Sequence, residues 1–253
     1  MNRTLKATAV LMLMMVFAVS CTKPEGPNNG GNNNGQNDSI VNPSNNGEND
    51  SIADNSGTLN GHDFVDLGLP SGTLWATCNV GADSIADYGD FFAWGETSPK
   101  ETYNWENYNY YDYATNMLTK YCVNDWNSNS GYYGQEDMLV VLEAVDDAAT
   151  VNWGDSWRTP TCDEWRELRD NCLHEFTTRN GVNGHLFKSP NGNSIFIPVR
   201  PSYCDCYGEY WSSSLYIEEP RSAYRFYFTE TDYKVSVENR YRAGLVRPVY
   251  SGE

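Results

Sequence analysis

Basic residues are scarce in this sequence, and one long stretch has none. Lysine and arginine together number 17 against 34 aspartates and glutamates, and neither basic residue occurs between Lys23 and Lys100. Phosphate binding needs clustered lysines and arginines that release counterions. The sequence therefore predicts that nucleic acid is not a partner. An acidic surface also repels polyanionic sugars, so a glycan ligand should be neutral, cationic or bridged by a metal ion.

Motifs for catalysis and metal binding are missing as well. The three histidines, His62, His174 and His185, do not form a metal-binding pair such as HExxH. No GxSxG elbow or phosphate-binding glycine loop occurs. The adjacent acids at 146–147 and 218–219 are expected to lie on solvated faces. The sequence thus predicts no catalytic residue, no cofactor and no metal site.

Aromatic residues are almost absent from the first quarter of the chain. Phe17 is the only one before Phe64. A core can form only beyond that point, so we expect one globular domain over residues 61–253. Residues 21–60 are rich in Asn, Gly, Ser and Pro, and a polar motif at 34–40 recurs at 46–52. Such a segment buries too little apolar surface to offset its conformational entropy, which predicts a disordered linker.

The first 20 residues have the pattern of a secretory signal peptide. Arg3 and Lys6 precede an apolar run that is too short to span a bilayer. Small residues then lead to Cys21, as in the lipobox of bacterial lipoproteins, although Ala18 stands where a lipobox usually has Leu. Ordinary signal-peptidase cleavage is the alternative. Lipidation of Cys21 with palmitate-like chains would hold the protein on the outer membrane or cell surface, because each buried methylene contributes about 0.8 kcal/mol.

Short strands and at least one helix are predicted within residues 61–253. The helix begins at the N-cap Thr161, where Glu164 completes a capping box, and Trp165, Leu168 and Cys172 follow at helical spacing. A second helix is expected through residues 138–142 and beyond. Strands are expected at 64–67, 74–77, 91–94, 185–188, 194–197, 210–214, 223–228, 233–237 and 245–249. This pattern predicts an α+β domain.

Several motifs then carry a resemblance to a known family. They are VDLGLPSGTLWA at 65–76, YGDFFAWGE at 88–96, WRTPT at 157–161, YWSSS at 210–214 and GLVRPV at 244–249. In this order they resemble the Fibrobacter succinogenes major paralogous domain, a family abundant in lipoproteins of Bacteroidetes. The resemblance covers nearly all of residues 62–250. It implies a C-type-lectin-like fold, similar also to formylglycine-generating enzymes, in an envelope-exposed domain, and it names no ligand.

The domain departs from that family at its cysteines. Export implies an oxidising compartment, so six cysteines are available for disulfides: Cys78, Cys122, Cys162, Cys172, Cys204 and Cys206. The sequence leaves their pairing open. The segment with Cys204 and Cys206 is shorter than the loop expected in the family, and Cys162 stands where the family commonly has a charged or small residue. A disulfide joining these two places would account for both departures.

One aromatic segment differs from the rest. Five tryptophans at 75, 94, 157, 165 and 211 lie in apolar motifs and are expected in the core. The segment 103–113 instead interleaves rings with Asn, Glu and Asp, so some rings should stay exposed. Exposed Tyr and Trp suit stacking on sugars or docking of proteins, whereas packing on the domain itself is the alternative. The candidate ligand-binding residues are Tyr103, Trp105, Tyr108, Tyr110, Tyr111 and Tyr113.

Together these patterns favour a non-catalytic, membrane-anchored envelope lipoprotein whose domain binds a protein or glycan ligand. A structural or assembly component of a surface complex is the alternative. An enzyme of the formylglycine-generating type is less favoured, because no local motif here transfers the reactive cysteine pair of those relatives. Calcium-dependent sugar binding is also disfavoured, because the Glu-Pro-Asn, Gln-Pro-Asp and Trp-Asn-Asp tripeptides of C-type lectins do not occur.

Overall fold

The computed structural model describes residues 56–123, 134, 136–199 and 207–251. The predicted signal peptide (1–20), Cys21 and most of the predicted linker lie outside the described residues, as do Cys204 and Cys206. None of the described helices is long and apolar enough to cross a membrane.

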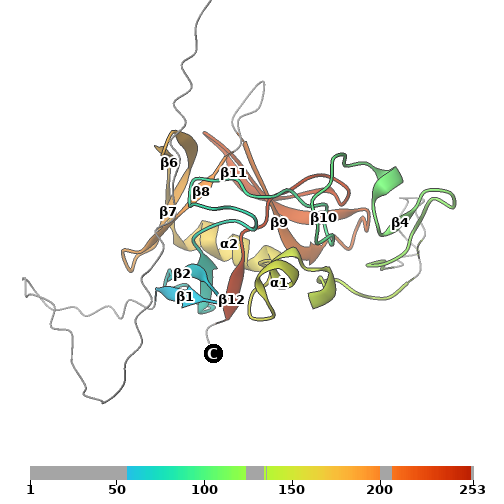
Figure 1. The fold of residues 1–253 in the computed structure, drawn as a ribbon, viewed down its shortest axis with the longest axis horizontal. Helices are drawn as coiled ribbons and strands as arrows, with labels where there is room; N and C mark the ends of the chain where they lie inside the picture. The colour runs from blue at the N-terminus through green and yellow to red at the C-terminus, as the bar shows by residue number, and fades with distance from the viewer. Residues whose placement is uncertain (1–55, 124–133, 135, 200–206, 252–253) are drawn as a thin grey trace, which may run out of the picture. The chain divides into compact units, whose positions relative to one another are not determined.

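Small antiparallel sheets make up most of the domain (Figure 1). One sheet has the order β1-β2-β3-β12, from strands Gly57–Leu59, His62–Asp66, Thr73–Ala76 and Val249–Ser251. The last strand pairs with β3, so this sheet joins the two ends of the described domain. With few helices beside them, these sheets confirm the coarse prediction of an α+β, mostly β domain.

Two further sheets have three strands each. The first has the order β6-β7-β8, from Leu173–Arg179, Val182–Lys188 and Ser194–Pro198. The second has the order β11-β10-β9, from Tyr233–Asn239, Ser222–Thr229 and Tyr207–Leu215. The predicted pairings of 185–188 with 194–197 and of 223–228 with 233–237 are confirmed. The strand β6 was not predicted.

The predicted helix is confirmed as α2, Cys162–Asn171. The Thr161 hydroxyl accepts a bond from the Glu164 amide at 3.2 Å, and the Glu164 carboxylate accepts one from the Thr161 amide at 2.7 Å. This capping box satisfies two of the otherwise unpaired amides of the first turn. Trp165 and Leu168 are fully buried. The Trp165 ring stacks on Phe226 of β10 with centroids 4.8 Å apart, which packs the helix against the β9–β11 sheet.

The second predicted helix is wrong as placed. Residues 138–142 are not helical: Met138 has a positive φ of 56°, and Val141 forms an isolated antiparallel bridge with Ser214. The chain becomes helical only at the 3-10 turn η2, Ala144–Asp146, and at α1, Ala148–Trp153. Residues 140–142 follow the free side of β9, where the Leu142 amide donates to the Ser213 carbonyl at 2.9 Å and the Leu215 amide donates to the Val140 carbonyl at 2.8 Å. Pairing with β9 satisfies backbone groups that a helix would have paired internally.

The predicted boundary between linker and domain is too late. The strand β1 lies inside the range predicted as linker, and it pairs with β2 across the turn Asn60-Gly61. Both turn residues have positive φ, 50° and 82°, as a tight hairpin of this kind requires. The Asn-Gly pair therefore belongs to a hairpin, although the Asn- and Gly-rich composition around it predicted disorder.

Two predicted strands are only partly formed. Residues 91–94 make an isolated bridge, in which Phe92 exchanges two 2.9 Å backbone bonds with Gly244. In the closing segment 245–249, only Val249 belongs to a strand, and Leu245 bridges Tyr210. The five tryptophans predicted for the core are confirmed there: Trp75, Trp94, Trp157, Trp165 and Trp211 are each at most 3% exposed.

Candidate functional site

The aromatic segment 103–113, named here the aromatic loop, lies at one end of the domain. It contains the 3-10 turn η1, Trp105–Asn107, and strand β4, Tyr111–Asp112, which pairs with β5, Met117–Leu118. In Figure 1, β4 lies at the opposite end of the domain from β6 and β7. Asn104 and Asn107 cap η1 reciprocally through their side chains, which fixes the turn that presents Trp105.

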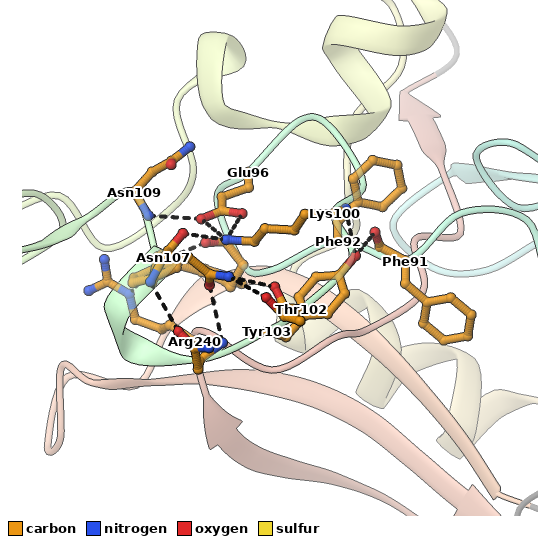
Figure 2. A network of polar contacts seen from close by, with 12 residues as sticks. Phe91, Phe92, Glu96, Lys100, Thr102, Tyr103, Asn107, Asn109 and Arg240 are labelled. Carbon is orange, nitrogen blue, oxygen red and sulfur yellow. Dashed lines mark hydrogen bonds and ion pairs between the residues drawn. The ribbon is translucent and has the colours of Figure 1, made fainter.

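A buried ion pair holds the start of the aromatic loop. The Lys100 ammonium lies 2.6 Å from a Glu96 carboxylate oxygen and also donates to the Asn107 carbonyl at 2.7 Å. Glu96 is almost fully buried and accepts a 2.8 Å bond from the Asn109 amide. Figure 2 shows Lys100 between these partners, with the Tyr103 hydroxyl donating to Phe91. Because a buried ion is costly without partners, this network favours one position of the loop.

Arg240, just after β11, holds the middle of the loop. Its guanidinium is fully buried and donates four bonds of 2.8–3.0 Å, to the Tyr108 hydroxyl and to the carbonyls of Lys120, Tyr121 and Pro220. It also lies 5.0 Å from the ring centre of Trp94. Burial raises the pKa of Tyr108 to about 12 against the opposing charge of Arg240. Tyr108 therefore keeps its proton and donates it to the Trp94 carbonyl at 2.8 Å.

Asp146 binds three further side chains in this region. Its carboxylate accepts bonds from the hydroxyls of Tyr110 at 2.6 Å and Tyr121 at 2.5 Å, and lies 2.5 Å from the Lys120 ammonium. Burial raises the pKa of this carboxyl, but the bonds from Lys120, Tyr110 and Tyr121 outweigh burial and leave the pKa below its ordinary value. Asp146 is therefore an anion at neutral pH. Burial and the bond to Asp146 raise the pKa of Tyr110.

The prediction that Asp146 and Asp147 lie on a solvated face is wrong. Both are buried, and Asp147 accepts bonds from the amide and hydroxyl of Thr159 at 2.8 and 2.7 Å while capping α1. The side chains of Tyr110, Tyr121 and Thr159, which satisfy these acids, come from elsewhere in the chain. The other adjacent pair, Glu218 and Glu219, is exposed as predicted.

The six candidate ligand-binding residues differ in exposure. Tyr108 and Tyr111 are buried, so direct ligand contact is wrong for these two. Their hydroxyls and rings are used within the domain, because Tyr108 binds Arg240 and Tyr111 packs on Trp105. Tyr103, Trp105 and Tyr110 are half-buried. Tyr113 is 60% exposed, which confirms that at least one ring of the loop stays open to solvent.

Three rings that are at least partly open to solvent, together with the buried Tyr111 ring that contacts two of them, are named here the aromatic face: Trp105, Tyr111, Tyr113 and Tyr241. The Trp105 ring lies 4.7 Å from Tyr111 and 4.9 Å from Tyr241, and Tyr111 lies 6.5 Å from Tyr113. The Arg221 guanidinium carbon lies 4.1 Å from the centre of the Trp105 ring. A cation at this distance over an indole face is attracted by its electron density and orients the ring.

Three residues of this region were not predicted from sequence. Arg221, Arg240 and Tyr241 flank strands β10 and β11, more than a hundred positions after the loop that they hold. No local pattern marks them. The run Arg240-Tyr241-Arg242 in an acidic chain is the only available signal, and it does not identify which arginine is buried.

The described cysteines correct the disulfide prediction in part. No disulfide joins any two of Cys78, Cys122, Cys162 and Cys172. Cys162 and Cys172 lie at the two ends of α2, about 15 Å apart at 1.5 Å per residue, which is too far for a disulfide. Cys78, Cys122 and Cys172 pack in separate hydrophobic clusters. A disulfide to Cys204 or Cys206 lies outside the described residues.

The histidines and acids of the described residues do not form a metal centre. No group of three or more His, Cys, Asp or Glu side chains lies close enough there to hold an ion. His62 stacks on Trp153 with centroids 3.6 Å apart, and the ring nitrogen Nε2 of His185 lies 2.7 Å from the Thr229 carbonyl oxygen. These two histidines are packed side chains.

No family model, curated protein or solved structure matches this chain. The resemblance described from the sequence motifs stays a prediction.

Proposed function

We propose that residues 56–251 form a non-catalytic recognition domain that binds a protein or glycan ligand through the aromatic face. The proposal includes export, lipidation at Cys21 and display from the outer membrane on the segment that precedes Gly57. It also includes membership of the C-type-lectin-like folds, as the sequence motifs imply. The aromatic loop takes the place of a calcium-bound sugar site as the ligand-contacting region.

The observation that carries the proposal is the combination of rigidity and exposure at the aromatic face. Trp105 is fixed by Arg221, Tyr111 and Tyr241, and the loop beneath it is held by Glu96, Lys100 and Arg240. A ring that is already immobilised loses little conformational entropy when a ligand binds it. Tyr and Trp also combine a large apolar contact area with a polar group, as binding surfaces commonly require.

A binding screen tests the aromatic face. The mature chain with Cys21→Ser, which cannot be acylated, is screened against glycan and protein arrays with and without calcium. For any ligand found, Tyr241→Ala should weaken binding by about tenfold or more, because truncating an aromatic at a binding centre costs on the order of 1–2 kcal/mol. Tyr227→Ala removes a half-buried ring from β10 and serves as the control. Equal effects of the two variants would contradict the assignment of this face.

A labelling experiment tests the anchor separately. Cells expressing the full chain are grown with labelled palmitate, and incorporation should be lost in the Cys21→Ser variant. Substrate turnover by the purified protein would exclude a purely recognising role. Stable co-purification with one envelope complex after crosslinking, together with no free ligand on any array, would favour the structural or assembly role instead.

A further inference from the structure

Strands β6 and β7 lie at the end of the domain away from β4 (Figure 1). A second group of aromatic side chains joins these strands to β10 and β11. We name it the ring cluster: His174, Phe176, His185, Phe187, Phe228 and Tyr233. The register of β6 with β7 places His174 opposite Phe187 and Phe176 opposite His185. All four therefore project from one face of that sheet, toward Phe228 of β10 and Tyr233 of β11.

His185 is the centre of this cluster and has one usable polar partner. Its side chain is fully buried, and Nε2 lies 2.7 Å from the Thr229 carbonyl oxygen. A carbonyl only accepts, so Nε2 carries the hydrogen and Nδ1 is the unprotonated nitrogen. Nδ1 is buried without a hydrogen-bond partner. A second proton on this ring would therefore lie among Phe176, Phe187 and Phe228, with no acceptor.

His174 couples the cluster to solvent and to β11. Its ring centre lies 5.6 Å from that of His185 and 3.7 Å from that of Tyr233. The side chain is exposed at the edge of the cluster, and partial burial lowers its pKa. Burial also lowers the pKa of His185, although the bond to Thr229 opposes the shift. Two charged imidazoles at this separation would repel each other.

Other charges do not compensate a proton in the cluster. Among the described residues, His174 is the one titratable group whose charge acts on His185. On β6 and β7, Glu175, Arg179 and Lys188 alternate to the opposite face of the sheet. The remaining nearby charges are paired with each other: Lys234 with Asp232 by β11, Arg169 with Asp170 on α2, and Arg225 of β10 with Glu209 and Glu238. Glu230 lies exposed in the turn after β10.

We propose that the ring cluster is an acid-sensitive contact, in which protonation of His185 and His174 releases the β6–β7 hairpin from β10 and β11. The contribution to stability is fully present above the ordinary histidine pKa of 6.5 and is lost as pH falls below it, because the unfolded chain then binds protons that the folded cluster rejects. This pH range, just below 6.5, is one that biological compartments reach. The device is independent of the aromatic face.

Hydrogen exchange on the full chain tests this proposal. Exchange is measured at about pH 7.5 and about pH 5.5 and corrected for intrinsic rates. Protection of residues 182–188 and 226–229 should fall on acidification, by up to about tenfold for each histidine, because pH 5.5 lies about one unit below the ordinary pKa of 6.5 at which the unfolded imidazole binds its proton. Protection of β3 should change less. Unchanged protection of β7 would overturn the proposal.

Two variants and one spectroscopic measurement complete the test. His185→Gln keeps a side-chain N–H for the Thr229 carbonyl but cannot take up a proton, so it should remove the part of the acid response that is due to His185 and leave only the part due to His174. His62→Gln removes a histidine outside the cluster and should leave the response of β7 intact. If His185→Gln fails to fold, nuclear magnetic resonance titration of the wild-type imidazoles decides the question. Titration of His185 at or above the ordinary value of 6.5 would overturn the proposal.

Discussion

The two ends of the domain hold their aromatic side chains by different means. At the aromatic loop, buried charged groups fix the rings: Arg240 binds Tyr108, and Asp146 binds Tyr110. In the ring cluster, rings pack on rings, and the bond of His185 to Thr229 is the polar anchor. Charged hydrogen bonds specify direction as well as distance, whereas ring packing mainly excludes water.

This difference predicts that the two ends lose stability at different pH values on acidification. Asp146 stabilises the loop end above its ordinary pKa of 3.8, and this contribution is lost only as pH falls through its lower folded pKa. The histidines of the ring cluster lose their contribution as pH falls below 6.5. On gradual acidification the ring cluster should therefore loosen first, while the aromatic loop stays in place.

Replacing Arg240 should cause the largest loss of stability, because it removes the buried charge that fixes the aromatic loop. Arg240→Met leaves the Tyr108 hydroxyl and the carbonyls of Lys120, Tyr121 and Pro220 buried without this donor. Since each such group costs about 1–3 kcal/mol, we expect the free energy of unfolding to fall by about 3–5 kcal/mol. Chemical denaturation measures this loss. Arg242→Met, at an exposed position, should change stability by less than about 0.5 kcal/mol.

Replacing Asp146 should have the next largest effect. Asp146→Asn removes the charge that accepts from Tyr110, Tyr121 and Lys120, and we expect a loss of about 2–3 kcal/mol at neutral pH. The difference from wild type should shrink as pH falls below 3.8, because the unfolded wild-type chain then binds a proton that folded Asp146 takes up only at lower pH. Denaturation at several pH values measures this. Asp232→Asn, in an exposed ion pair, is the control and should cost under about 1 kcal/mol.

The end of the domain that holds the ring cluster, with helix α2 and the three-stranded sheets, was more predictable from sequence than the end that holds the aromatic loop. Helix α2 carries its own start signal in Thr161 and Glu164, and strand β11 alternates apolar and polar residues. These signals lie within short stretches of sequence, so they can be recognised without knowledge of the tertiary structure. The run 138–142 had no such signal. Its apolar residues predicted a helix, but Val140 and Leu142 form backbone hydrogen bonds with β9 instead.

The loop end was less predictable because its contacts join distant parts of the chain. The aromatic loop was found from its composition alone. Its anchors were not, since Arg240 and Asp146 are ordinary charged residues until the fold surrounds them with donors and acceptors. The hairpin turn at Asn60-Gly61 was missed for a different reason, because the same residue types fill the preceding linker.

A smaller loss of stability is expected from the cap of helix α2, at the end of the domain that holds the ring cluster. Thr161→Ala removes the acceptor of the Glu164 amide at the start of α2, and we expect a loss of about 1 kcal/mol. The helix covers the β9–β11 sheet, so the change should also increase hydrogen exchange along α2. Asn104→Ala removes the equivalent cap from the single turn η1 and provides the matched change at the loop end. A loss above about 3 kcal/mol for Thr161→Ala would mean that more than a helix cap had been removed.

Tyr113→Ala should have the smallest effect on stability and a clear effect on binding. The ring is 60% exposed and contacts Tyr111 at its edge, so we expect the free energy of unfolding to change by less than about 0.5 kcal/mol. If the aromatic face contacts ligand, affinity should fall by about tenfold, since a contacting aromatic contributes on the order of 1 kcal/mol or more. Tyr216→Ala, a half-buried tyrosine after β9, is the control. Calorimetry on each variant separates the two readouts, and unchanged affinity for Tyr113→Ala would place the ligand on the Trp105 and Tyr241 side of the face.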